Sequence, residues 1–120
     1  MIHSELSEMV IGAAMQVLNE LKPGLNEKIY ENALVLELRA QGLSVEQQCQ
    51  FTVQYKGQEV GMLIPDLIVG GQIIVDTKVV AAFNESHVAQ MLGYLAITNM
   101  KLGLLINFKS AKLEWKRIVR

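Results

Sequence analysis

The chain has 120 residues, of which 51% are hydrophobic and 19% are charged, and its formal net charge is −1. So much apolar content excludes a disordered or collagen-like chain, and a charge near zero argues against a broadly basic nucleic-acid coat protein. The length suits one domain over residues 1–120, which buries roughly two thirds of the surface of the unfolded chain.

Two amphipathic helices are predicted in the first third of the chain. Apolar residues recur at helical spacing over residues 6–21, and Pro23 and Gly24 end this helix. A second helix is predicted to begin near residue 26. It stops at Gly42, because glycine readily adopts the left-handed conformation found just after a helix end.

Beyond residue 48 the hydrophobic period changes to two, which indicates strands. Residues 49–55 alternate between apolar and polar side chains, and the only cysteine, Cys49, is read there as a small core residue. A turn at residues 56–58 leads to a second strand over about 59–69. After Gly70-Gly71, a third strand is predicted over about 72–80.

The last third of the chain predicts one helix and two strands. Asn84 or Ser86 caps a helix that runs to about residue 98. The apolar run over residues 102–108 is a buried strand, and residues 113–119 form a last, basic strand. This order of elements predicts an α/β fold with a mixed central sheet flanked by helices on both faces.

Three charged residues interrupt the nearly apolar second and third strands: Asp66, Asp76 and Lys78. A buried charge without a partner costs several kcal/mol, so these groups need one another or a metal ion. Asp76 and Lys78 are two residues apart and therefore share a face of the sheet. Two interpretations stay open: an all-oxygen site suited to Mg²⁺ or Mn²⁺, or a buried Asp–Lys ion pair beside one aspartate in a turn.

The length of the loop between these strands decides whether Asp66 joins the other two residues. A two-residue loop would place Asp66 and Asp76 on opposite faces of the sheet. A three-residue loop, which pairs Ile68 with Gln72, would bring Asp66, Asp76 and Lys78 together. We therefore predict a loop with an odd number of residues, and a strict two-residue hairpin would contradict the site.

Other polar residues stand in unusual positions on the predicted helices. Glu27 begins the core-facing stripe that continues with Tyr30, which is unusual for a glutamate without a ligand to hold, although an acid near a helix start also complements the helix dipole. Gln90 and Tyr94 are four residues apart and share one helix face. A pair of this kind is weak evidence alone.

Together these residues resemble the PD-(D/E)xK nuclease superfamily, and most closely its small GxxExxY family. The matching positions, in chain order, are Gly24, Glu27 and Tyr30 for the family name, Pro65-Asp66 for the first acidic motif, Asp76-Thr77-Lys78 for the (D/E)xK motif, and Gln90 with Tyr94 for the QxxxY motif of RecB-like members. The resemblance covers essentially the whole chain and implies a restriction-endonuclease-like αβββαβ core. The sequence departs from the family at position 76, where glutamate is more common.

The resemblance implies Mg²⁺-dependent (or Mn²⁺-dependent) hydrolysis of phosphodiester bonds in DNA or RNA. Asp66, Asp76 and the backbone carbonyl of Thr77 would hold the metal ion, and Glu27 would bind the metal or its water shell. Lys78 would position or activate the attacking water. In addition, Gln90 would orient Lys78 or the substrate backbone, Tyr94 would pack behind Gln90, and Tyr30 would support the site.

Charge is distributed unevenly along the chain. Residues 1–50 carry seven acidic and three basic side chains, whereas residues 101–120 carry six basic side chains and one acidic one. The basic strand is either an ordinary solvated face or a contact surface for the nucleic-acid backbone. The candidates for that contact are Lys109, Lys112, Lys116 and Arg117.

The alternative function is a catalytically idle nucleic-acid-binding or assembly module with the same fold. At this length we expect no separate specificity domain, so any sequence specificity should come from a homodimer or a partner protein. The uncharged stretches are too short to cross a bilayer, which takes about 20 apolar residues. No secretory signal pattern is visible, and we expect a cytoplasmic protein without a membrane contact.

Overall fold

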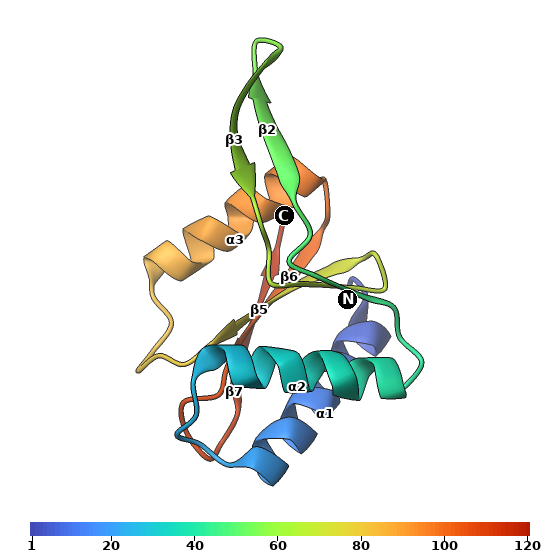
Figure 1. Ribbon diagram of the computed structural model, residues 1–120, viewed down its shortest axis with the longest axis vertical. Helices are drawn as coiled ribbons and strands as arrows, with labels where there is room; N and C mark the ends of the chain where they lie inside the picture. The colour runs from blue at the N-terminus through green and yellow to red at the C-terminus, as the bar shows by residue number, and fades with distance from the viewer.

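The computed structural model describes residues 1–120 and contains three helices and seven strands (Figure 1). The helices are α1 (Ser4–Leu21), α2 (Glu27–Ala40) and α3 (Glu85–Thr98). The strands are β1 (Val45–Gln47), β2 (Phe51–Tyr55), β3 (Gln58–Leu63), β4 (Leu67–Val69), β5 (Ile73–Lys78), β6 (Leu102–Asn107) and β7 (Glu114–Val119). No helix is both long enough and apolar enough to cross a membrane.

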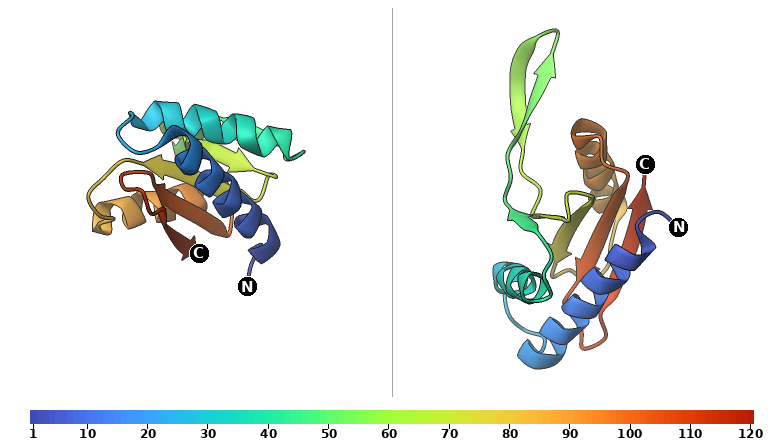
Figure 2. Two further views of the ribbon diagram at one scale, coloured as in Figure 1. Left: turned by 90° about the horizontal axis from the view of Figure 1, so that it is seen from below. Right: turned by 90° about the vertical axis from the view of Figure 1, so that its right-hand side faces the viewer.

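Five strands form a mixed sheet in the order β1-β4-β5-β6-β7. Only β5 and β6 pair in parallel, because α3 connects them as a crossover, and the other neighbours are antiparallel. Helices α1 and α2 cover one face of this sheet and α3 covers the other (Figure 2). The predicted mixed sheet with helices on both faces is confirmed.

Each face of the sheet has its own apolar cluster. The larger cluster contains odd-numbered residues of β5, such as Ile73 and Val75, packed against α1 and α2. The smaller contains Ile68 and Ile74 with Met91 and other residues of α3. Because side chains alternate along a strand, this division places Asp76 on the α3 face, together with Ile74.

Strands β2 and β3 form a separate two-stranded hairpin that extends away from the main sheet (Figures 1 and 2). The expectation of one strand over residues 59–69 is therefore wrong, because the chain leaves the ladder between Leu63 and Leu67. Pro65 explains the break, since proline donates no backbone hydrogen bond and restricts the residue before it. Strand β1, which pairs with β4, was not predicted from the sequence.

The loop between β4 and β5 has three residues, as predicted. Val69 pairs with Ile73, which leaves Gly70, Gly71 and Gln72 in the loop. The expected pairing of Ile68 with Gln72 is wrong, because the register is shifted by two residues. A shift of two keeps every side chain on its face, so Asp66 and Asp76 still share one. Both glycines have positive φ angles, of 61° and 65°, that favour glycine.

Candidate metal centre

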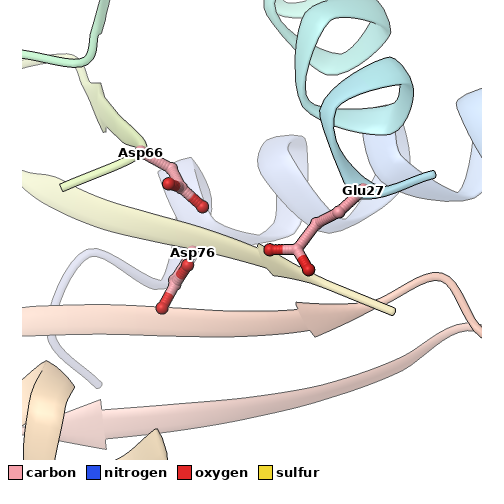
Figure 3. A group of neighbouring side chains, drawn as sticks. All are labelled: Glu27, Asp66 and Asp76. Carbon is pink, nitrogen blue, oxygen red and sulfur yellow. The ribbon is translucent and has the colours of Figure 1, made fainter. Parts of the chain in front are cut away.

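Three carboxylates converge at one end of the main sheet (Figure 3). One carboxylate oxygen from each of Glu27, Asp66 and Asp76 lies within 4.8 Å of the corresponding oxygens of the other two. Glu27 is the first residue of α2, Asp66 directly precedes β4, and Asp76 lies in β5. Three segments that are distant in the sequence therefore contribute one carboxylate each.

Asp76 is the most enclosed of the three residues, with 4% of its surface exposed. Its Oδ2 atom lies 3.0 Å from Nζ of Lys78 but accepts no hydrogen bond of ordinary geometry, although it is buried. A buried carboxylate needs a donor or a cation, and the single ammonium of Lys78 cannot balance the three acids that meet here. With two further carboxylates beside it, this oxygen fits a hard divalent cation such as Mg²⁺ or Mn²⁺.

Asp66 is held by the strand beside it. Its Oδ2 atom accepts hydrogen bonds from the backbone amide of Thr77 at 3.1 Å and from the Thr77 hydroxyl at 3.4 Å. Its backbone carbonyl accepts from the amide of Gln48 at 2.9 Å. These bonds keep Asp66 facing Asp76 after the chain has left the hairpin. A metal-binding role for the Thr77 carbonyl stays a prediction.

Burial and the crowding of negatively charged carboxylates raise pKa values at this site. Burial raises the pKa of Asp66 to about 7, helped by the adjacent Asp76 carboxyl and by the negative charge of Glu31. Burial also raises the pKa of Glu27, to which the charges of Asp66 and Glu31 add. Without a cation, the folded protein therefore holds protons more tightly here than ordinary carboxylates do.

Lys78 is the basic residue of this cluster. Burial would lower its pKa, but the adjacent Asp76 carboxylate, with Glu27 and Asp66, outweighs that effect and raises it. Its ammonium group is therefore charged near neutral pH. The structure thus brings together four of the residues predicted from the sequence, namely Glu27, Asp66, Asp76 and Lys78.

Tyr30 fixes the start of α2 and hence the position of Glu27. Its hydroxyl donates a hydrogen bond to the carbonyl of Lys22 at 2.6 Å and accepts one from the amide of Leu25 at 3.1 Å. The fully buried ring stacks on Phe108, with ring centroids 4.8 Å apart. Tyr30 therefore ties the loop between the first two helices to the end of β6.

Two buried polar residues near the site were missed by the sequence analysis. Asn107 is 1% exposed, and its side chain bonds the amide and the carbonyl of Val80, which anchors the chain just beyond Lys78. Glu31 is 3% exposed and accepts hydrogen bonds from Lys28, Gln47 and Gln48. The available signals were an asparagine that ends an apolar strand and a second acid one turn after Glu27.

Gln90 and Tyr94 lie on α3, beside the base of the hairpin. Gln90 is exposed and makes no hydrogen bond to Lys78, so its orienting role stays a prediction. Tyr94 is partly buried and packs against the smaller apolar cluster. Burial and the charges of Asp76 and Asp66 raise the pKa of Tyr94, as expected for a phenol near the acidic site.

The predicted basic contact residues have different environments. The guanidinium of Arg117 is bonded to the Ser7 hydroxyl and to the carbonyl of Ile2, both at 2.7 Å, and so anchors α1 to β7. Lys109, Lys112 and Lys116 are exposed. The side chains of these three lysines, unlike that of Arg117, are therefore accessible to the phosphates of a nucleic acid.

Comparisons with known proteins agree with this architecture. In sequence, residues 4–118 match the family described as the PD-(D/E)XK nuclease superfamily. No curated protein sequence matches the chain significantly. Among solved structures, the chain is similar to SSO0001, with a TM-score of 0.61 at 17% identity, over 98% of this chain and 59% of that one. It therefore spans less than two thirds of that relative.

A second similar structure is an alkaline exonuclease, LHK-Exo, from Laribacter hongkongensis, with a TM-score of 0.51 at 14% identity. The match covers 95% of this chain and 82% of the exonuclease. The same enzyme in complex with dAMP gives a TM-score of 0.53 at 13% identity. Such low identities establish a shared fold, and the family match over nearly the whole sequence establishes descent. The chain belongs to the PD-(D/E)XK nuclease superfamily.

Proposed function

We propose that this protein is a nuclease that uses Mg²⁺ or Mn²⁺ to hydrolyse phosphodiester bonds in DNA or RNA, and that within the superfamily it is a member of the GxxExxY family. The positions that support this assignment are Gly24, Glu27 and Tyr30. Superfamily membership and the exonuclease among the similar structures support a nuclease.

One observation carries the proposal of metal dependence. A buried oxygen of Asp76 is paired only with the Lys78 ammonium at 3.0 Å, and carboxylate oxygens of Glu27 and Asp66 lie within 4.8 Å of the Asp76 carboxylate, so that one ammonium faces three acids. A protein that only binds nucleic acid gains nothing from three carboxylates that repel one another and a phosphate. A divalent cation would remove both repulsions, because it neutralises the acids and attracts the phosphate.

The residues of the site have separate roles in this proposal. Asp66 and Asp76 hold the ion, with Glu27 binding the ion or its water shell and the Thr77 carbonyl as a further ligand. A bound ion would supply the positive charge that polarises the phosphate and makes a water molecule a better nucleophile. Lys78 then donates a hydrogen bond from its charged ammonium, which orients the attacking water and stabilises charge on a phosphoryl oxygen. Gln90 assists by orienting Lys78 or the substrate backbone.

The exposed lysines of the C-terminal segment contribute sequence-independent contacts to phosphates in this proposal. Lys116 pairs with Leu105, which in turn pairs with Asp76, so all three residues lie on one face of the sheet. Lys109 follows the end of β6 next to the anchor residue Asn107. Any sequence specificity would come from a second copy or a partner protein.

The experiment is metal-dependent cleavage by the purified protein and by Asp76→Asn and Glu27→Gln. We expect labelled DNA or RNA to be cut in millimolar Mg²⁺ or Mn²⁺, not to be cut in a chelator, and cleavage to be lost in Asp76→Asn. Glu20→Gln, an exposed acid at the end of α1, is the matched control and should retain cleavage. Cleavage by Asp76→Asn at the wild-type rate would place the active site elsewhere.

A thermal measurement separates the nuclease from the idle module. If the metal concentration is tenfold above the dissociation constant, binding stabilises the fold by about 1.4 kcal/mol and raises the melting temperature by about 5 °C. Asp76→Asn should abolish this rise. Absence of any rise in the wild-type protein, together with absence of cleavage, would favour the idle nucleic-acid-binding or assembly module.

A further inference from the structure

A groove lies between the β2–β3 hairpin and α3, with a cavity volume of about 510 Å³. The hairpin contributes Val53, Met62 and Ile64 to its lining, and α3 contributes Gln90 and Tyr94. Several of these side chains are accessible: Met62 is 52% exposed and Ile64 is 39% exposed. No charged side chain lines the groove.

The groove lies next to the segment that carries Asp66. Ile64, in its lining, is separated from Asp66 only by Pro65. Tyr94 packs against the apolar cluster that contains Ile68 and Ile74. Alternate residues of a strand share a face, so Asp66 lies on the same face as Ile68, and Asp76 on the same face as Ile74. A ligand beside Tyr94 therefore lies on the face of the sheet that carries both aspartates.

The chemistry of the lining selects the kind of ligand. A phosphate group needs cations or clustered amide donors, and the groove offers neither. A nucleobase is flat and largely apolar on its faces, with hydrogen-bonding groups on its edge. Aliphatic walls and the Tyr94 ring suit the faces, and the Gln90 amide can both donate to and accept from the edge.

We propose that this groove binds an unpaired nucleobase adjacent to the scissile phosphate, so that the substrate class is single-stranded nucleic acid. A base in a duplex is paired and stacked, and it would have to leave the helix to enter the groove. The proposal rests on the proposed nuclease function, and it assigns Gln90 and Tyr94 to substrate binding. The metal-binding residues are a separate set.

Gly93 offers a sharp test. It lies in α3 and lines the groove, and a Cβ atom added there would meet no atom within 4 Å. Gly93→Leu therefore starts its side chain in open space at the groove, and leucine is a better helix former than glycine. Gly12→Leu is the matched control, because Gly12 lies in α1, is exposed and is equally free of neighbours.

The measurement is the dissociation constant for three labelled probes of equal length: oligothymidylate, an abasic strand and a DNA duplex. All proteins carry Asp76→Asn to prevent cleavage. We expect oligothymidylate to bind on the order of tenfold more tightly than the abasic strand, since one stacked base contributes about 1–3 kcal/mol. Gly93→Leu should reduce binding of oligothymidylate to the abasic level, and Gly12→Leu should have no effect.

Three outcomes would overturn the inference: equal binding of oligothymidylate and the abasic strand, an unchanged affinity in Gly93→Leu, or tighter binding of the duplex. Self-association of the protein that Gly93→Leu abolishes would also overturn it, because the groove would then be an interface between copies. Metal-dependent cleavage by the protein with Asp76 intact is measured separately. Its absence would refute the proposed function, whereas cleavage without a base preference would refute only the groove assignment.

Discussion

The hydroxyl of Tyr30 connects the loop between α1 and α2 to the core, and its removal tests how the first helix turn of the site is held. Tyr30→Phe keeps the ring and its stacking on Phe108, which has an interplanar angle of 7°. It removes the bonds to the Lys22 carbonyl and the Leu25 amide. The perturbation is therefore confined to two hydrogen bonds.

The magnitude follows from the surroundings of these two backbone groups. Each hydrogen bond contributes about 0.5–1.5 kcal/mol net, and the loss is larger when a polar group is left buried without a partner. Lys22 and Leu25 are exposed residues, so water can reach part of the loop. We therefore expect Tyr30→Phe to lower the free energy of unfolding by about 1–3 kcal/mol.

The assay is urea unfolding of the metal-free protein, followed by titration of Mg²⁺ into the folded variant. Because α2 begins at Glu27, three residues before Tyr30, a looser loop should also weaken metal binding. Tyr55→Phe is the control, since Tyr55 is 64% exposed and its hydroxyl makes no hydrogen bond, and it should change the free energy by less than about 0.5 kcal/mol. A Tyr30→Phe effect as small as that of the control would refute the reasoning.

Two further predictions concern the pH dependence of stability and the loop before β5. The pKa of Asp66 is raised to about 7 by burial and by Asp76, so the metal-free folded state keeps a proton that the unfolded chain releases near its ordinary value of 3.8. The free energy of unfolding should therefore fall as the pH rises between these values, and Asp66→Asn should flatten that slope. An unchanged slope would show that other groups cause it. Gly70→Ala and Gly71→Ala should each lower the melting temperature, because alanine in the left-handed region costs roughly 1–2 kcal/mol. Gly70→Ala should have the larger effect, because its Cβ would lie 3.1 Å from Cδ2 of Leu6, and equal effects would contradict this.

Much of the fold could be predicted because its signals are local. Helical periodicity located α1, α2 and α3, and Asn84 does cap α3, where its side chain accepts a hydrogen bond from the amide of His87 at 3.0 Å. Alternation along β5 placed Asp76 and Lys78 on one face. The odd length of the loop with Gly70 and Gly71 followed from the requirement that buried charges meet.

Strand pairing was less predictable. The separate β2–β3 hairpin and the pairing of β1 with β4 depend on contacts between segments, and alternation alone does not reveal which partner a strand has. Pro65 was visible in the sequence as a potential break. Its effect depended on how the chain continues into β4, where residues 67–69 pair with both β1 and β5.

The environment of individual side chains was least predictable. Arg117 was expected to meet the nucleic-acid backbone in a basic strand, yet its partners Ser7 and Ile2 lie at the other end of the sequence. Glu31 and Asn107 likewise gain their importance from distant partners. A sequence pattern reports burial, but the partner that satisfies a buried polar group is set by the packing of the whole chain.

The sequence by itself determined the amphipathic helices, the apolar strands and the set of charged residues that these strands cannot bury alone. Its motifs, which occur in order with suitable spacing, also indicated the PD-(D/E)XK nuclease superfamily. Only the tertiary structure decided that the carboxylates from α2, from the segment before β4 and from β5 meet within 4.8 Å. The physical reason is that periodicity reflects which side of an element is buried, whereas convergence depends on sheet register and helix docking, both of which arise from long-range packing.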